Sequence, residues 1–446
     1  MQQKINFNRK RMYITAKKLV QAKSFSGLFL VLMAITAMLL ANSFFSEQYF
    51  SLLNLPIGLN ISDMCLSIDA KHWVNDVLMT FFFMLAGLEI KRALQVGELS
   101  SLQMASFPVM GALGGMIMPT LIYILFNTTE YQYGFAIPMA TDIAFALGLL
   151  LLLGNRIPIS LKLFLVALAI VDDLGAVIVI ALFYSDTLNI IGLALSVFTL
   201  FLMYMLNLKG VKSLLPYMLL GFLLWNWFHM LGIHASVSGV LIAFTIPIRA
   251  AIDTNSFLRR LKLRLNYFES LEQKKHEKML TERQIGALDI MGHSYELVQS
   301  PMIRLEHHLI PISAFLVMPT FAFFNAGVEL SSVNLSLLHP VSLGIIFGLV
   351  IGKPLGIFGA VFISQKIGIA KKPENLRWVD VFGVSILGGV GFTMSIFVGD
   401  LAFTDQELLN LAKLSVILAS MISGIIGMIW LYISIVADKP DLRGEF

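Results

Sequence analysis

Long apolar runs follow one another along most of this 446-residue chain, and they restrict it to an all-α membrane fold. Hydrophobic residues make up 57% of the sequence and charged residues 13%, whereas soluble proteins carry about 25% charged residues. A helix that crosses a hydrocarbon core of about 30 Å needs about 20 apolar residues. We therefore predict about twelve transmembrane helices, at about 25–44, 72–93, 104–127, 134–153, 158–184, 187–207, 212–229, 231–248, 307–330, 341–365, 378–400 and 407–436.

The distribution of Lys and Arg among the loops predicts how these helices are oriented. With a cytoplasmic N-terminus, Lys71 alone falls on an external loop, and the other loop Lys and Arg fall inside, as membrane insertion favours. The run at 25–44 ends without a small-residue cleavage signature, so we interpret it as a retained first helix. The expected organisation is a cytoplasmic tail at 1–24, a transmembrane domain at 25–436 and a cytoplasmic tail at 437–446.

Two connections are long enough to hold structure of their own. The external segment 46–71 has Pro and Gly punctuation and fair β content, which predicts a short hairpin. The inside loop 250–306 is charged, and Leu258, Leu261, Leu265 and Phe268 recur in it at helical spacing. That pattern predicts an interfacial or solvated helix, with a regulatory arm as the alternative. The single cysteine, Cys65, excludes an internal disulfide and a Cys-based metal cluster.

Four charged residues stand deep inside the predicted spans: Asp142, Asp172, Asp173 and Lys353. Each would cost about 2.5–3.5 kcal/mol at the membrane centre if it were isolated, so they must be paired, protonated or hydrated. The stem of Lys353 reaches only about 6 Å towards an interface roughly 15 Å away, which argues against snorkelling. Neighbouring residues point about 100° apart on a helix. We therefore expect one of Asp172 and Asp173 to pair with Lys353 and the other to bind a cation, and the sequence leaves open which does which.

Two of the spans carry helix-breaking residues near mid-membrane. Pro138 precedes Asp142 by four residues, and Gly388, Gly389 and Gly391 interrupt another span. Interruptions in corresponding positions of two halves indicate a transporter site between inverted repeats. These two spans are the fourth and the eleventh, so they should cross in opposite directions near the midplane. By charge sign, Asp142 suits two facing positive helix ends and Lys353 two negative ones.

Seven motifs together resemble the NhaA-type sodium/proton antiporters of bacterial inner membranes. They are, in the family's order and spacing, "NDVLMTFFFMLAGLEIKR", "ATDIAFALG", "ALAIVDDLGAV", "HASVSGV", "LEHHLIPISAFLVMPTFAFFNAGV", "GKPLGI" and "GGVGFTMSIF". The resemblance implies that Asp172 and Asp173 include the carriers of Na⁺ and protons. It places Thr141 and Asp142 beside them at the broken helix, and it makes Lys353 the essential embedded cation. Positions linked to the cytoplasmic funnel, pH response or subunit contacts are Asp76, Glu89, Arg92, His234 and Glu306.

The same resemblance implies a function. The expected protein is a secondary-active antiporter of the inner membrane that exports Na⁺ and Li⁺ in exchange for protons, electrogenically and under pH regulation. It would need no cofactor and would dimerise with a second copy through the external hairpin. Ala93 stands where the family often has a second glutamate, and Ile310 where a histidine can occur, with His308 introduced nearby. These departures bear on the pH threshold and leave the core ion site intact.

Several other classes of protein fit the sequence less well. A sodium-coupled solute symporter would usually need a larger polar pocket, and a channel would need rings of charge. An intramembrane aspartyl protease needs two facing carboxylates, which adjacent Asp172 and Asp173 cannot form, although Asp142 could complete a pair. No GxxxxGK[ST] phosphate loop supports ATP-driven pumping. Lys and Arg lie in short loops rather than on one basic face, which argues against nucleic-acid binding.

Overall fold

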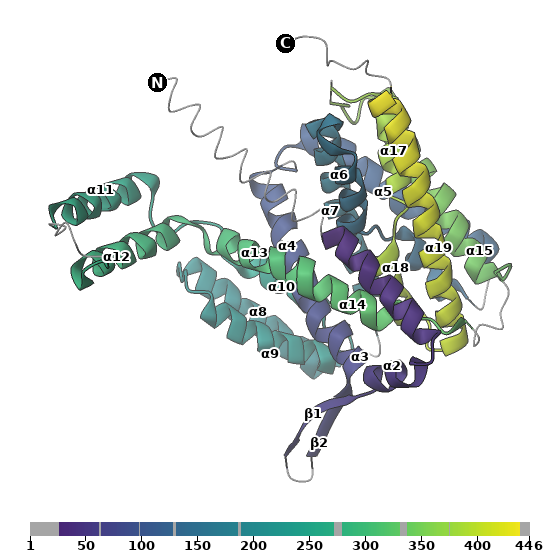
Figure 1. Ribbon diagram of the computed structural model, residues 1–446, viewed down its shortest axis with the longest axis horizontal. Helices are drawn as coiled ribbons and strands as arrows, with labels where there is room; N and C mark the ends of the chain where they lie inside the picture. Colours follow the sequence, from purple (N-terminus) through teal and green to yellow (C-terminus); the bar gives the residue numbers. More distant parts are fainter. Residues whose placement is uncertain are drawn as a thin grey trace.

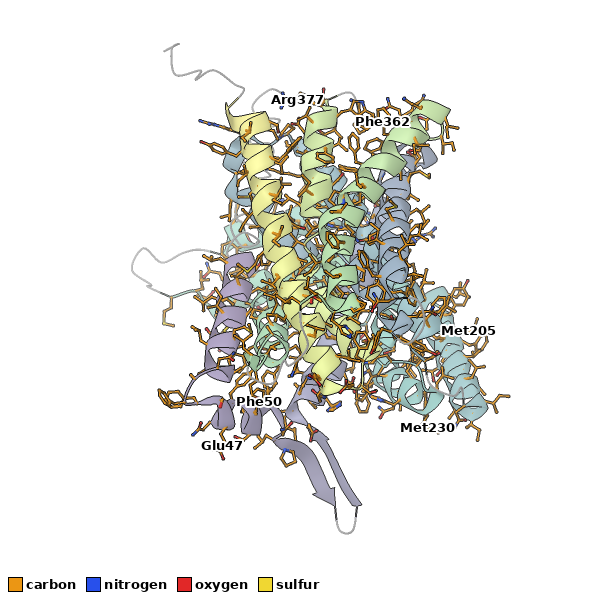
Figure 2. The ribbon with its side chains drawn as sticks, turned by 90° about the vertical axis from the view of Figure 1, so that its right-hand side faces the viewer. Glu47, Phe50, Met205, Met230, Phe362 and Arg377 are labelled. Carbon is orange, nitrogen blue, oxygen red and sulfur yellow. The ribbon has the colours of Figure 1, made fainter. Side chains whose placement is uncertain are left out.

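The computed structural model is a bundle of helices with a β-hairpin projecting from one end (Figure 1). The described residues are 26–61, 64–97, 99–127, 131–185, 189–271, 279–330, 337–373 and 375–437. The predicted N-terminal tail, 1–24, lies outside them, as does the predicted C-terminal tail, 437–446, apart from residue 437. Figure 2 shows Arg377 and Phe362 at the end of the bundle away from the β-hairpin, and we call these two ends the opposite end and the β-hairpin end.

Helices cover each of the twelve predicted runs. The first helix is Ser26–Ala41. The helices up to the predicted inside loop are α2 (Ser46–Leu53), α3 (Ala70–Trp73), η1 (Val74–Leu78), α4 (Met79–Gln95), α5 (Leu102–Phe126), η2 (Gln132–Met139), α6 (Ile143–Leu152), η3 (Gly154–Arg156), α7 (Ile159–Phe183), α8 (Ile190–Leu208), α9 (Leu215–Leu231) and α10 (Val237–Thr245). They are followed by α11 (Thr254–Ser270), α12 (Glu282–Val298), α13 (Pro301–Ile312), η4 (Ser313–Val317), α14 (Met318–Asn325), α15 (Pro340–Phe347), η6 (Gly348–Gly352), α16 (Lys353–Ile367), α17 (Trp378–Leu387), α18 (Phe392–Ala402), α19 (Gln406–Leu431) and η7 (Tyr432–Ala437).

Not every predicted run forms a helix that is long enough to cross a membrane. Within the described residues, seven helices are long and apolar enough to do so, or nine if each bent pair counts as one span. The predicted span 231–248 is helical only over α10, whose nine residues extend about 13 Å and cannot cross a core of about 30 Å alone. The count of twelve spans is therefore not confirmed, whereas an integral multi-pass membrane protein is.

The same order of elements occurs twice, as an inverted repeat requires. A long helix, an interrupted helix and a second long helix follow one another as α5, η2–α6 and α7, and again as α15–η6–α16, α17–α18 and α19. The two halves meet where α5 packs closely on α16: a Cβ on Gly356 would lie 2.1 Å from the carbonyl oxygen of Gly114. Glycine at both positions therefore lets the two backbones approach.

The first interruption falls at slightly different residues from those predicted, whereas the second falls at the predicted glycines. Pro138 lies inside η2, a 3₁₀ segment, and the helical geometry is lost only at Ala140–Asp142. A 3₁₀ turn tolerates a proline better than a continuous α-helix does, because fewer i→i−4 bonds are broken. In the second half, α17 ends at Leu387 and α18 begins after Gly391, with a bend of 45° between them.

The two long connections contain more structure than the sequence indicated. In segment 46–71, α2 precedes the antiparallel hairpin of β1 (Pro56–Ile61) and β2 (Met64–Asp69), which confirms the predicted hairpin. The loop 250–306 holds the expected helix as α11, a second helix α12, and the first turns of α13. Ser300 caps α13, with Pro301 at its first position, so the predicted loop is too long at its end.

Adding a methyl group at the α5–α16 contact should weaken the fold. We expect Gly356→Ala to lower the stability of the purified protein by about 1–3 kcal/mol, because the backbone of α5 must move away. A Cβ added at Gly359 on the same helix would meet no atom within 4 Å, so Gly359→Ala is the matched control and should be neutral or slightly stabilising. Thermal unfolding in detergent would measure both, and equal effects would contradict the tight contact.

Candidate functional site

Two stretches of non-helical backbone lie side by side in the middle of the bundle. Ala140–Asp142 joins η2 to α6, and Gly388–Gly391 joins α17 to α18. The amide of Asp142 donates to the carbonyl of Val390 at 2.7 Å, which links the two interruptions directly. The chain thus crosses itself between the two repeats, as the sequence predicted.

Asp142 lies between the N-terminal ends of two helices. Its Oδ1 accepts from the amide of Phe145 in α6 at 2.9 Å. Its Oδ2 accepts from the amide of Thr393 in α18 at 3.1 Å and from the Thr393 hydroxyl at 2.5 Å. Each helix end carries roughly half a positive charge, so a fully buried carboxylate here is neutralised by backbone. This is the position expected from its charge sign.

Lys353 pairs with Asp172 rather than Asp173. Its ammonium lies 2.5 Å from Asp172 Oδ2 and also donates to the carbonyl of Met139 at the end of η2. Lys353 thus meets one negative helix end and one carboxylate, where the charge sign alone had suggested two helix ends. The Thr141 hydroxyl is 2.6 Å from Asp172 Oδ2 and 3.0 Å from the carbonyl of Gly388 at the end of α17, so its single proton can satisfy either one.

Asp173 has no hydrogen bond or ion pair with any described residue, although it is only 3% exposed. Its side chain lines a cavity of about 90 Å³ together with Glu89, Ser313 and Ile310. The neighbouring Asp172 also leaves Oδ1 buried without a hydrogen-bond partner in the described part of the chain. These unpaired carboxylate oxygens are the ligand type that a hard cation such as Na⁺ prefers.

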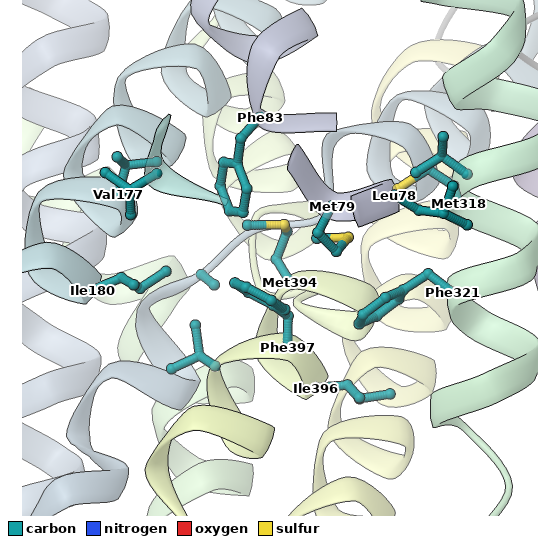
Figure 3. Close-up of a cluster of buried hydrophobic side chains, with 14 of the residues drawn as sticks. Leu78, Met79, Phe83, Val177, Ile180, Met318, Phe321, Met394, Ile396 and Phe397 are labelled. Carbon is teal, nitrogen blue, oxygen red and sulfur yellow. The ribbon is translucent and has the colours of Figure 1, made fainter. Parts of the chain in front are cut away.

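An apolar cluster closes the site towards the β-hairpin end. Figure 3 shows Phe83, Met79, Phe321, Met318 and Phe397 packed together, and the ring of Phe397 lies 5.6 Å from that of Phe83. Met318 also lines the cavity of Asp173, and Phe397 lines a second pocket of about 540 Å³ beyond the cluster. The cluster therefore separates the two.

Two predicted residues, Asp76 and His234, lie in that second pocket, at the β-hairpin end, and not beside Asp172 and Asp173. Asp76 is 3.2 Å from His234 and 3.7 Å from His229, in each case measured to the imidazole Nε2. His234 also contacts the Ser236 hydroxyl at 2.7 Å. The structure thus groups Asp76 and His234 with each other.

The remaining predicted residues lie on the other side of the apolar cluster. Glu89 shares the cavity of Asp173, and Arg92 forms an ion pair of 3.2 Å with the buried Glu306. Ala93 is buried, whereas Ile310 is partly buried at the wall of that cavity.

Among the described residues, no group of three or more His, Cys, Asp and Glu is arranged to hold a resident metal ion.

Sequence reasoning missed residues that the structure places at the crossing and at the β-hairpin end. Thr393 holds Asp142. It lies two residues after Gly391, so its position at the start of a helix was the available signal. Lys413, a charge inside the span 407–436, binds Asp400 at 2.9 Å, and Lys71 reaches the same oxygen at 3.3 Å. This cluster joins α3, α18 and α19 at the β-hairpin end.

A membrane bundle whose two interrupted helices cross around buried aspartates and a lysine has the architecture of a secondary transporter. The family model described as "Na+/H+ antiporter 1" matches residues 17–431. The chain belongs to this Na⁺/H⁺ antiporter family, which confirms the resemblance inferred from its motifs.

Similar proteins cover almost the whole chain. The Na⁺/H⁺ antiporter NhaA of Wolinella succinogenes is 47% identical over 417 residues, which are 93% of this chain and 92% of that protein. The Na⁺/H⁺ antiporter NhaA of Helicobacter pylori strain G27 is 46% identical over 424 residues, covering 94% and 95% of the two chains. The solved structure of the sodium proton antiporter MjNhaP1 from Methanocaldococcus jannaschii has a similar fold, with a TM-score of 0.51, 11% identity, and coverage of 97% of this chain and 100% of that one.

Removing the partner of Asp172 should destabilise the protein. We expect Lys353→Ala to cost about 3–5 kcal/mol, because it leaves a buried carboxylate uncompensated. The double variant Lys353→Ala/Asp172→Asn should recover part of that loss, since it removes the orphaned charge as well. Thermal unfolding of the four proteins of this cycle would measure the coupling, and strictly additive effects would contradict the ion pair.

Proposed function

We propose that this protein exchanges Na⁺ for protons across a bacterial inner membrane, with Asp172 and Asp173 as the carriers. The observation that supports it most directly is Asp173, a buried carboxylate beside a cavity, with no partner among the described residues. An isolated charge at such a place is too costly to persist. Asp173 must therefore hold either a proton or a cation, and the two compete for the same oxygens.

Such competition yields exchange without ATP. A site that reorients when it holds Na⁺ or protons, and not otherwise, carries Na⁺ in one direction and protons in the other by mass action. Asp142 and Lys353 keep the crossing intact in both cases, because they neutralise helix ends and Asp172 rather than the transported ion. The names of the relatives, which are Na⁺/H⁺ antiporters, support the same assignment.

Access to the site would alternate by movement of the crossing. The cavity of Asp173 is also lined by Glu89 and Ser26, while the apolar cluster lies between this cavity and the pocket at the β-hairpin end. Phe397 belongs to α18, which also holds Asp142 through Thr393. Displacement of α18 relative to α4 and α14 would therefore open the cluster and turn the site outwards.

The direction of transport and its regulation in this proposal rest on the membrane orientation predicted from the Lys and Arg of the loops. The opposite end faces the cytoplasm, both chain ends lie there, and Na⁺ or Li⁺ leaves as protons enter. More protons than Na⁺ move in each cycle, so the membrane potential contributes about 2.3 kcal/mol per charge at 100 mV. Regulation by pH would act at the cytoplasmic side, where Glu89 and the Arg92–Glu306 pair lie near the cavity.

The β-hairpin supports a homodimer. In the described part of the chain β1 and β2 pair only with each other, so each has one edge with unpaired backbone groups. Such edges readily pair with a second chain. A second copy in the same membrane presents the same strand edge at the same height, so the two edges can pair to form a dimer.

The geometry argues against two alternative functions, solute symport and intramembrane proteolysis. The cavity of about 90 Å³ holds an ion with little water but not an organic solute, whose pockets measure about 300–1,000 Å³. A protease dyad would need Asp142 to face Asp172 or Asp173, yet both oxygens of Asp142 are occupied by helix N-termini. Transport of an ion remains the function that fits the site.

Exchange should depend on both adjacent aspartates. In vesicles containing the purified protein, addition of Na⁺ or Li⁺ should collapse an imposed pH gradient, whereas K⁺ should not. We expect Asp173→Asn and Asp172→Asn to abolish this response, because each replaces a charged oxygen ligand by a group that cannot carry a proton. The readout is the fluorescence of a pH-sensitive dye.

Asp289→Asn is the matched control, since Asp289 is exposed on α12 and lies far along the chain from the site. It should respond like the wild-type protein. Substantial exchange in both Asp172→Asn and Asp173→Asn would refute the carrier assignment. A wild-type protein that gives no response to Na⁺ or Li⁺ at any pH would refute the exchange itself.

A further inference from the structure

The helices α11 and α12 form a helical hairpin that stands away from the bundle. Figure 1 shows it projecting sideways, beyond α8 and α9. Within it the two helices pack on each other, and α11 has no buried side chain. The amides of Ala251 and Ile252 donate to the carbonyl of Leu297 at 3.0 and 3.2 Å, which ties the two ends of the helical hairpin together.

A pocket of about 400 Å³ lies between the two helices, and its polar wall is basic. Arg260 and Arg264 are one turn apart on α11, so their side chains lie on the same face. His293 and Ser294 face them from α12. The acidic residues of the described helical hairpin are not among those that line the pocket.

The two arginines are available to a ligand. Arg260 and Arg264 are exposed and have no hydrogen bond or ion pair with the described residues. His293 is 3.9 Å from Glu296, which also lies 3.8 Å from Arg304, so this acid, which does not line the pocket, is shared between His293 and Arg304. A pair of free guanidinium groups presents the planar donors that match phosphate oxygens.

The rest of the pocket is apolar and open. Leu263 is 64% exposed, Tyr267 43% and Ile290 41%. If this surface met only water, three large apolar side chains would be unfavourably exposed beside the pair of arginines. An interfacial helix combines these two features, because the basic groups meet headgroups while the apolar groups enter the boundary with the acyl chains.

The position of the helical hairpin favours a lipid over a soluble ligand. The chain enters it from the end of α10 that points away from the β-hairpin, and it leaves into α13. Neighbouring α8 exposes Ile191, Val197 and Phe198 by more than half, as a lipid-facing helix does. A segment that projects sideways past such a helix lies over the adjoining lipid.

We propose that the pocket between α11 and α12 binds the phosphodiester headgroup of an anionic phospholipid, at Arg260 and Arg264. Leu263, Tyr267 and Ile290 contact the glycerol and the first acyl carbons. The α11 sequence carries Arg259, Arg260, Lys262 and Arg264 against the single acid Glu269, so the complementary charge is negative. This site is separate from the ion site, and its test does not depend on transport.

The test measures lipid binding to the full-length protein after removal of bound lipid in a neutral detergent. Short-chain phosphatidylglycerol, phosphatidylcholine and inorganic phosphate are titrated separately, and native mass spectrometry counts the bound molecules. The variant is Arg260→Gln/Arg264→Gln. The matched control is Arg259→Gln/Lys262→Gln, which removes the same charge from α11 at two exposed residues that do not line the pocket.

We expect Arg260→Gln/Arg264→Gln to lower the affinity for phosphatidylglycerol at least about tenfold, since two charge-assisted hydrogen-bonding groups are lost. The control should change it less than about twofold, as loss of distant surface charge does. Phosphatidylcholine should bind more weakly than phosphatidylglycerol to the wild-type protein.

Three results would overturn the proposal. Equal losses in the two double variants would show that only overall charge matters. Unchanged binding in both would place the lipid elsewhere. Inorganic phosphate that binds as tightly as phosphatidylglycerol, and displaces it, would make this a site for a soluble anion. All four substituted side chains are exposed, and thermal unfolding would verify that both variants remain folded.

Discussion

The structure depends on neutralising helix ends where two interrupted helices cross inside the membrane. Each interruption leaves amide and carbonyl groups without helical partners, in surroundings where no bulk water can satisfy them. Asp142 receives the two amide ends, and Lys353 and Thr141 meet the carbonyl ends at Met139 and Gly388. Once Lys353 is fixed in this way, its remaining donor capacity goes to Asp172. Asp173 is then the carboxylate at the crossing without a partner among the described residues, so the electrostatics of the backbone decide which aspartate faces the cavity.

The helix α18 connects the parts of the protein that have to change together. Its first turn holds Asp142 through Thr393, its middle contributes Phe397 to the apolar cluster, and its end carries Asp400. Asp400 binds Lys413 on α19 and Lys71 on α3, so one of its ion pairs stays within the second repeat and the other leads out of it. A shift of α18 therefore changes the proposed ion site, the apolar cluster and the ion pairs of Asp400 at once. Separate movement of the three is hindered, because a helix of eleven residues behaves as a rigid rod.

Local sequence signals predicted the fold and much of the site, and tertiary packing decided the rest. Hydropathy located the helices of the bundle, and charge sign placed Asp142 at positive helix ends, because both depend on short stretches of chain. The partner of Lys353 depends on how α7 is rotated against α16, which no local pattern encodes. The apolar cluster of Figure 3 consists of ordinary hydrophobic residues from several helices, and nothing in their spacing distinguishes them. In contrast, α12 begins with a capping box of Thr281 and Gln284, a local signal that was present in the sequence and went unused.

The charges around the crossing support the proposal that one site serves two ions in turn. Three carboxylates and one ammonium lie at the crossing, and backbone dipoles offset the charge of Asp142. Lys353 offsets one of the two that remain, so the site lacks one positive charge. A Na⁺ ion or a first proton supplies that charge equally well by count, and the low dielectric makes binding of both together unfavourable. The further proton of the proposed electrogenic exchange would bind the second proposed carrier, Asp172. Discrimination between the two ions then depends on the number of oxygen ligands, because a proton needs one oxygen whereas Na⁺ needs several. Asp172 Oδ1 and the Asp173 carboxylate provide the unpaired oxygens that only the metal ion requires.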